Sequence, residues 1–293
     1  MNFTCLPDLR CRLGESPVWD ERRELLFFVD ILAPAIHAVR LDGSDLKTWP
    51  MPRPVGSIGL TESGRIVAAV WHDLMLLDPE SGTLDRFATL AGEPATNRLN
   101  DGKVGPDGAF WVGTMDTGNP RRPNGSLFRV TADGRIARKA TGYGVSNGLA
   151  FSPDGRMLFH SDSFADAPMI ERFAFDPANG EIGERVEIAR LDDTTGFPDG
   201  AACDANGDYW SAGVFAGRLN RFSPDGRLID SMAVPVPAPT MPCFCGGDLR
   251  TLVLTSLKES SNPRALAAHP QSGGLLLARA DVAGVPVGRL KGL

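Results

Sequence analysis

Two families of turn signals alternate along the chain and divide its 293 residues into units of similar length. In the first family a glycine precedes an apolar stretch, and successive glycines lie 44, 47, 52 and 40 residues apart. In the second family a glycine follows Asp, Ser or Asn, and the spacings are 39, 52, 46, 46 and 47 residues. The first family comprises the turn at 20–23 and then Gly64, Gly108, Gly155, Gly207 and Gly247; the second comprises Gly43, Gly82, Gly134, Gly180, Gly226 and Gly273.

Six units with two hairpin signals each predict four strands per unit. This pattern indicates an all-β fold, a six-bladed β-propeller with four-stranded antiparallel blades around a central channel, and we interpret residues 1–293 as one such domain. Seven or eight blades would need more turn pairs, and two packed sandwiches would not require the regular alternation. No window has a sustained helical period, so helices should be few. We expect the first ten or so residues to add an outer strand to the last blade and close the ring.

Charge and hydropathy exclude several classes of partner. The net charge is −6 with both signs interspersed, so no basic stripe favours nucleic acid or an anionic membrane. Asp8 and Arg10 interrupt the region where a signal peptide needs an apolar run, and no apolar run is long enough to span a bilayer. The five cysteines form no disulfide framework and are interpreted as small buried hydrophobes. These features predict a soluble, cytoplasmic protein.

Three oxygen-bearing residues occupy the same place in three successive units. Asn100, Asn147 and Asp199 each lie eight residues before the turn glycine of their unit, and the same count back from Arg23 reaches Glu15. In a repeat fold an equal offset means an equivalent position, here the start of the innermost strand that lines the channel. The second unit has Gly56 at this place, and the sixth has a proline-rich stretch near position 239.

A ring of side-chain oxygens suits a hard divalent cation. Glu15, Asp199 and an asparagine carbonyl would supply two negative charges and one neutral oxygen, a set that fits Ca²⁺, Zn²⁺, Mg²⁺, Mn²⁺ or Fe²⁺. Three protein ligands leave coordination positions open, as in catalytic metal sites. The alternative is that Asn and Asp merely cap turns, although turn capping does not predict equal offsets.

Around these positions the chain resembles the senescence marker protein-30/gluconolactonase family of regucalcin-like sugar lactonases. The strings that carry the likeness are Leu13-Gly14-Glu15-Ser16-Pro17-Val18-Trp19, Arg98-Leu99-Asn100-Asp101-Gly102-Lys103, Gly113-Thr114-Met115, Ser146-Asn147-Gly148-Leu149, Phe197-Pro198-Asp199-Gly200 and Pro242-Cys243-Phe244-Cys245-Gly246-Gly247. They run from the first unit to the last, so the resemblance covers nearly the whole chain.

The resemblance implies one divalent metal held by Glu15, Asn147 and Asp199, and substrate contacts from Arg98 and Asn100. It implies hydrolysis of a sugar aldonolactone, of the gluconolactone or pentonolactone type, to the open acid. Some members carry an acidic pair after Gly-Thr-Met that helps to bind the sugar.

Here Asp116 follows that motif, and we expect it to substitute as a substrate-binding residue. Our mechanistic hypothesis gives Asp199 a second role as the catalytic general base, while the metal polarises the carbonyl and activates water. Asp101 would point away from the channel in a regular strand, so we interpret it as structural.

Three other functions compete with this interpretation. Residues 144–148 match the Gly-x-Ser-x-Gly nucleophile elbow, but a strand follows the motif where the elbow needs a helix, and the four histidines suggest no triad. We therefore interpret His160 as a blade residue. A non-catalytic, calcium-binding propeller is a second alternative, because the fold alone does not decide function. A metal-dependent aryl-ester or organophosphate hydrolase is a third.

Overall fold

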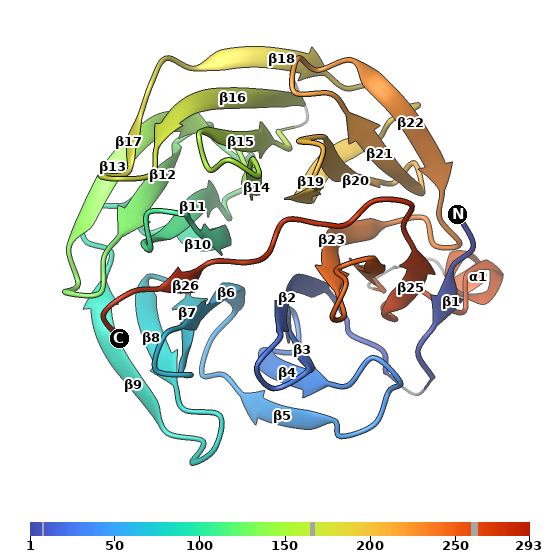
Figure 1. The fold of residues 1–293 in the computed structure, drawn as a ribbon, viewed down its shortest axis with the longest axis horizontal. Coiled ribbons are helices and arrows are strands. Elements are labelled where there is room, and N and C mark those ends of the chain that lie inside the picture. The colour runs from blue at the N-terminus through green and yellow to red at the C-terminus, as the bar shows by residue number, and fades with distance from the viewer. Residues whose placement is uncertain (8, 165–167, 259–262) are drawn as a thin grey trace.

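The computed structural model describes residues 1–7, 9–164, 168–258 and 263–293, and it folds them into six β-sheets arranged around a common axis (Figure 1). Each sheet has four or five strands, and apart from β1 and β26, which come from the two ends of the chain, the strands of each blade follow the chain outward from the axis. The predicted six-bladed propeller with four strands per blade is therefore confirmed. Among the described residues one short helix is present, α1 (Pro263–Ala268), and no helix is long and apolar enough to cross a membrane.

The strands of the first three blades follow in chain order. Blade 1 consists of β2 (Gly14–Asp20), β3 (Leu25–Asp30), β4 (Ala35–Val39) and β5 (Lys47–Pro50). Blade 2 consists of β6 (Val55–Thr61), β7 (Ile66–Val70), β8 (Asp73–Leu77) and β9 (Leu84–Thr89), joined by β26 (Arg289–Leu290). Blade 3 consists of β10 (Asn97–Val104), β11 (Phe110–Asp116), β12 (Gly125–Val130) and β13 (Ile136–Tyr143).

The remaining blades repeat the plan with two additions. Blade 4 consists of β14 (Ser146–Phe151), β15 (Met157–Asp162), β16 (Met169–Asp176) and β18 (Val186–Arg190), with β17 (Glu181–Ile182) paired to the end of β16. Blade 5 consists of β19 (Phe197–Cys203), β20 (Tyr209–Val214), β21 (Arg218–Phe222) and β22 (Leu228–Ala233). Blade 6 consists of β23 (Pro239–Cys245), β24 (Thr251–Ser256), β25 (Leu276–Arg279) and β1 (Thr4–Cys5).

The core lies between the blades. Strand β3 is buried at every position, which explains its continuous apolar run, because both of its faces pack against neighbouring sheets. Between blades 1 and 2, for example, Phe27 and Ile36 share one apolar cluster with Ile58 and Ile66. The outermost strands β9 and β22 have no fully buried position, since only one of their sides meets the protein.

Both chain ends contribute to ring closure. Thr4 of β1 pairs with Leu277 of β25, so the predicted outer strand from the N-terminus is confirmed. The C-terminal segment, residues 281–290, was not predicted; we call it the strap. It crosses one end of the propeller axis (Figure 1) and places β26 parallel to β6, inside blade 2. Arg289 on the strap bonds to Asp20 of blade 1, with an Nη2–Oδ1 distance of 2.6 Å.

The innermost strand of every blade departs from regular pairing near its start. The register shifts fall between Glu15/Val18, Val55/Ser57, Leu99/Gly102, Asn147/Ala150, Pro198/Ala201 and Pro239/Pro242. A β-bulge interrupts the strict alternation of side chains and turns a strand locally. Neighbouring residues on one strand can therefore both face the axis, and this is the point where each blade meets the cavity described next.

Candidate active site

A cavity of about 440 Å³ opens where the innermost strands begin. Five of the six blades contribute innermost-strand residues to its wall, and the connecting loops complete it. The lining polar residues are Glu15, Arg98, Asn100, Asp101, Arg121, Asn147, Ser163 and Asp199. The four positions that the repeat offset singled out are thus all brought together in one cavity.

Hydrogen bonds link the polar residues of three neighbouring blades into a chain. Nη1 of Arg98 donates to Oδ1 of Asn100 at 2.8 Å, and Nδ2 of Asn100 donates to Oδ1 of Asn147 at 2.7 Å. Nδ2 of Asn147 then donates to Oδ1 of Asp199 at 2.8 Å and to Oγ of Ser163 at 2.7 Å. These contacts fix the orientation of both amides.

Glu15 approaches the cavity from blade 1. One carboxylate oxygen, Oε2, accepts a 2.8 Å hydrogen bond from the backbone N–H of Ser16, which itself has a left-handed backbone with φ of 48°. The other, Oε1, is buried and has no hydrogen-bond partner among the described residues. Beside this site Gly56 allows blade 2 to pack closely against blade 3, because a Cβ there would lie 2.6 Å from the carbonyl oxygen of Leu99.

The acidic groups of the cavity carry an unbalanced negative charge. Burial first, and then the charges of Asp199 and Asp101, raises the pKa of Glu15 well above its ordinary value. Burial and the charge of Asp101 raise the pKa of Asp199 to about 8. Burial likewise raises the pKa of Asp101. Raised pKa values mean that the ionised carboxylates lack sufficient positive charge nearby.

The oxygen atoms that face this cavity are suitable ligands for a divalent cation. Oε1 of Glu15 is a buried oxygen without a partner, and Oδ1 of Asn147 accepts one hydrogen bond, which leaves a second lone pair. Asp199 adds a second carboxylate in the same cavity. Oxygen ligands of this kind suit a hard cation, whose charge would also stabilise the ionised form of both acids.

Asp101 lies at the cavity, contrary to the prediction that it faces away. The bulge between Leu99 and Gly102 breaks the alternation, so Asn100 and Asp101 both line the wall. Oδ2 of Asp101 accepts a 3.0 Å hydrogen bond from the backbone N–H of Leu149, and Oδ1 is buried without a partner among the described residues. Its position next to Asn100 was visible in the sequence, but the bulge was not.

Asp116 does not line the cavity, so the prediction that it contacts substrate needs correction. It is 1% exposed, and its two carboxylate oxygens accept hydrogen bonds from the backbone N–H groups of Gly118 and Arg122, each at 2.9 Å. A carboxylate used in this way orders the loop that follows it. The residue of that loop which reaches the cavity is Arg121, which sequence reasoning missed.

One wall of the cavity entrance is apolar. Phe197 and Phe215 meet edge to face with ring centroids 6.2 Å apart, and the side chain of Phe215 is 69% exposed. Phe164 and Val214 extend the same wall. Deep in the cavity Glu15 and Asn147 are only 7% and 5% exposed. On this side a ligand would therefore meet aromatic rings before it reaches Glu15 and Asn147.

Blade 4 contains a triad that the histidine positions did not suggest. Oγ of Ser146 lies 2.7 Å from Nε2 of His160, and Nδ1 of that ring lies 3.0 Å from Oε1 of Glu171. All three residues are 0% exposed, and none of them lines the cavity. Ser146 packs so tightly against blade 3 that a Cβ at Gly113 would lie 1.9 Å from its hydroxyl oxygen. No substrate can reach this serine, so the geometry belongs to the core.

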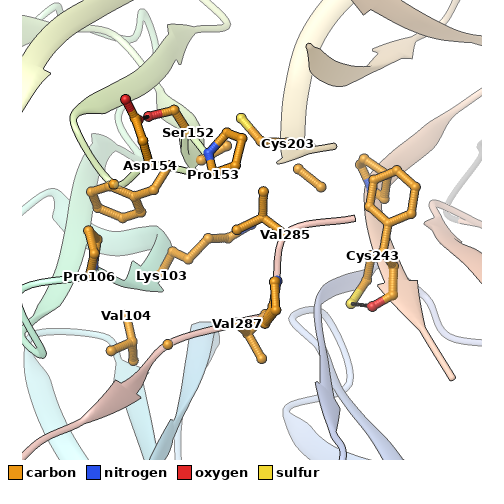
Figure 2. Close-up of a pocket in the computed structure, with 18 of the residues that line it drawn as sticks. Lys103, Val104, Pro106, Ser152, Pro153, Asp154, Cys203, Cys243, Val285 and Val287 are labelled. Carbon is orange, nitrogen blue, oxygen red and sulfur yellow. Dashed lines mark hydrogen bonds between the residues drawn. The ribbon is translucent and has the colours of Figure 1, made fainter. Parts of the chain in front are cut away.

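A second cavity, of about 310 Å³, lies at the other end of the innermost strands (Figure 2). The strap crosses it, with Val285 and Val287 pointing into the space (Figure 2), and the backbone N–H of Val285 bonds to the carbonyl of Cys203 at 3.0 Å. Lys103 also points into it and donates to the carbonyl of Ala201 at 2.7 Å. Its wall includes no acid–amide cluster like that around Asp199, so we place the candidate site in the first cavity.

The sequence and the fold of this chain are both similar to those of known proteins. The sequence profile of the SMP-30/gluconolactonase/LRE-like region matches residues 13–258. A 6-deoxy-6-sulfogluconolactonase of Pseudomonas putida is 41% identical over 93% of this chain and 92% of its own length. An L-arabinolactonase of Azospirillum brasilense is 35% identical over 99% and 95% of the two chains. Among solved structures, a calcium-binding protein, regucalcin, of Agrobacterium tumefaciens matches with a TM-score of 0.91 and 27% identity over 98% and 96%.

Proposed function

The chain belongs to the SMP-30/gluconolactonase/LRE-like family, and we propose that it is a hydrolase that opens a sugar aldonolactone to the aldonic acid with the help of one divalent metal ion. The observation that carries this proposal is the convergence of Glu15, Asn147 and Asp199 in one cavity, with Oε1 of Glu15 buried and unpartnered among the described residues. We assign these three residues as the metal ligands.

The metal is one of Ca²⁺, Zn²⁺, Mg²⁺, Mn²⁺ or Fe²⁺. All of these ions accept oxygen ligands, so the ligand set does not distinguish among them. When bound, such an ion would polarise the lactone carbonyl and lower the pKa of a neighbouring water. The protein's own contribution is the orientation of the ligands, because the hydrogen bonds from Asn100 and Asn147 hold the amide and carboxylate oxygens in place before substrate arrives.

Asp199 is proposed as the general base. Its carboxylate lies in the cavity with one oxygen, Oδ1, held by Asn147, so the attacking water can be deprotonated at that carboxylate as it adds to the carbonyl carbon. Burial and the charge of Asp101 raise the pKa of Asp199 to about 8 when no metal is bound, and a bound cation would stabilise the ionised form that a general base requires. The same carboxyl group can return the proton to the ring oxygen as the lactone opens.

Arg98 and Asn100 are proposed to orient the substrate, and each has capacity left for it. Arg98 uses Nη1 for the Leu99 carbonyl and for Asn100, so Nε and Nη2 have no acceptor among the described residues. Both hydrogens of the Asn100 amide are engaged, whereas Oδ1 keeps one lone pair. Arg98 can thus donate to a carbonyl or hydroxyl oxygen, and Asn100 can accept from a hydroxyl.

Two other functions remain as alternatives with observations behind them. The aromatic entrance at Phe197 and Phe215 would also accept an aryl ester or organophosphate. A calcium-binding propeller without catalysis would use the same oxygens, and one structural relative is described as a calcium-binding protein. Open donor groups on Arg98 beside the proposed metal ligands favour catalysis, since binding an ion alone requires no such group.

The test is a pH-indicator assay of acid release from gluconolactone, arabinonolactone and an aryl ester, with spontaneous hydrolysis subtracted. The protein is first treated with chelator and then given each metal in turn. The proposal predicts acceleration with a sugar lactone and a preferred metal. It also predicts at least about a 100-fold loss in Asp199→Asn.

Asp230→Asn is the matched control, because Asp230 is an exposed carboxylate on the outer strand of the same blade. Preference for the aryl ester would support the alternative hydrolase, and metal binding without any turnover would support the non-catalytic propeller. Full activity in Asp199→Asn would remove this residue from the mechanism.

A further inference from the structure

Two guanidinium groups from separate segments of blade 3 line the candidate active-site cavity. Arg98 comes from the innermost strand β10, and Arg121 comes from the loop between β11 and β12. Neither makes an ion pair of 4.0 Å or less with any described residue. Burial first, and then the charge of Arg121, lowers the pKa of Arg98 to about 10, while the charges of Glu15 and Asp199 act in the opposite direction.

Hydrogen bonds within its loop fix the position of Arg121. Its Nε donates a 2.9 Å hydrogen bond to the backbone carbonyl of Asp116, and the carboxylate of the same residue orders the turn through Gly118 and Arg122. Nη1 and Nη2 of Arg121 have no acceptor among the described residues. The terminal edge of the guanidinium, which presents two parallel N–H donors, is therefore available to a ligand.

The depth of the two arginines differs. Arg98 is half-buried and hydrogen-bonded to Asn100, beside the proposed metal ligands, whereas Arg121 is exposed on the entrance loop. A lactone whose carbonyl lies at the proposed metal ligands would direct its far end toward Arg121. The hydroxyls of a neutral sugar do not require a full positive charge at that end. The charges of Glu15 and Asp199 stabilise ionised Arg98, whereas no described carboxylate lies within 4.0 Å of the Arg121 guanidinium.

We propose that the preferred substrate is an anionic sugar lactone, with a carboxylate, sulfonate or phosphate at the end remote from the ring carbonyl, and that Arg121 binds this anion. The proposal rests on the function proposed above. An oxyanion would accept both terminal N–H groups of Arg121 in the bidentate geometry typical of guanidinium–oxyanion pairs. It would also reduce the repulsion between the two arginines. Arg121 is thus a specificity residue, with no role in bond cleavage.

The test compares kcat/KM for lactones that differ in one group: gluconolactone, its 6-phosphate, its 6-deoxy-6-sulfo analogue and the corresponding glucarolactone. Wild-type protein, Arg121→Ala, Arg121→Lys and Arg122→Ala are measured with the metal that supports turnover. Arg122 is the matched control, because it is the next residue of the same loop, is exposed, and does not line the cavity. Circular dichroism of each variant confirms folding.

We expect wild type to prefer at least one anionic lactone over the neutral one by about tenfold or more, and the anion with the highest ratio identifies the group. Arg121→Ala should lose about tenfold on that lactone and keep neutral gluconolactone within about twofold, since an exposed pair is partly screened. Arg121→Lys should retain part of the preference, and Arg122→Ala all of it. Because the interaction is ionic, the preference should also fall as salt rises.

A binding measurement separates this proposal from the function on which it rests. Calorimetry with 1,5-anhydroglucitol and its 6-phosphate, which have no lactone carbonyl, should give tighter binding of the phosphate to wild type and equal binding of both to Arg121→Ala. The anion proposal would be overturned if the protein hydrolyses neutral lactone and if Arg121→Ala keeps the wild-type ratio of kcat/KM for anionic over neutral lactone. The proposed lactonase activity would then still stand. Phosphate-selective binding through Arg121 without hydrolysis of any lactone would overturn the lactonase instead.

Discussion

Nδ2 of Asn147 and Oδ1 of Asp199 lie 2.8 Å apart, and this hydrogen bond joins blade 4 to blade 5 inside the cavity. The donor is an amide whose carbonyl oxygen is itself held by Asn100 of blade 3. Side chains from three blades thus help to fix the position of one carboxylate. Groups that are already in position need no reorganisation at the moment of reaction.

Glu15→Gln should remove metal binding without harming the fold. The raised pKa of Glu15 means that its ionised form is unfavourable in the metal-free protein, so a neutral amide of the same shape should leave the melting temperature unchanged or raise it. The wild-type increase in melting temperature on adding metal should be absent from the variant. Differential scanning fluorimetry with and without metal measures both effects. Glu187→Gln, at an exposed glutamate of blade 4, should behave as wild type; an undiminished metal response in Glu15→Gln would exclude Glu15 as a ligand.

Ser146→Ala should separate the buried triad from catalysis. The serine hydroxyl is 0% exposed and bonds to His160, so its loss should lower the free energy of unfolding by about 1–3 kcal/mol because a buried ring nitrogen loses its partner. Lactone turnover should stay within about threefold of wild type, since the proposed chemistry does not use this serine. Urea denaturation and the lactone assay measure the two quantities. A loss of turnover by orders of magnitude in a stably folded variant would instead indicate a serine hydrolase.

The ionised side chain of Glu171 should stabilise the fold at neutral pH, and this stabilisation should be lost in acid. Burial alone would raise its pKa, but the hydrogen bonds and charge of His160, the Tyr143 hydroxyl and Arg185 together lower the pKa below its ordinary value of 4.5. The carboxylate therefore stabilises the fold at pH values above its unfolded pKa, and this contribution disappears as pH falls through the lower, folded pKa. We expect the melting temperature of wild type to decline in acid more steeply than that of Glu171→Gln. Parallel declines would show that Glu171 is not the titrating group.

Arg289→Ala should loosen the strap. The guanidinium bonds to Oδ1 of Asp20 at 2.6 Å and to Oε1 of Glu21 at 3.0 Å, and its side chain is only 10% exposed. Asp20 keeps Arg23 as a partner, so we expect a loss of about 1–3 kcal/mol in the free energy of unfolding, measured with urea. Arg279→Ala breaks an exposed ion pair with Asp248 and should cost at most about 1 kcal/mol. Equal losses in the two variants would contradict a specific role for the strap contact.

The repeat made much of the site predictable, because turn glycines mark equivalent places in every blade. Counting back eight residues from them located Asn100, Asn147 and Asp199 on three innermost strands, and the structure gathers all three. Asp101 was assigned to the wrong side, because a bulge depends on how two strands pair and leaves no clear signal in one strand's residues.

Features that depend on loops and distant pairings could not be read in the same way. The strap follows the last turn signal and lacks an alternating pattern, so nothing local indicated that it would join β6. The contact between Ser146 and His160 requires the cross-strand register of blade 4. Arg121 reaches the cavity only because Asp116 orders its loop, and a chain of loop hydrogen bonds has no periodicity to detect.

The most direct test of the account is metal reconstitution of the chelator-treated protein, with turnover of a sugar lactone and bound metal measured in the same titration. We expect negligible turnover at the start, a linear rise as metal is added, and a plateau at one ion per chain. Asp199→Asn should neither bind the ion tightly nor recover activity. Full turnover by protein shown to hold no metal would exclude a metal-dependent reaction, because the cluster of Glu15, Asn147 and Asp199 would then have no catalytic ion to hold.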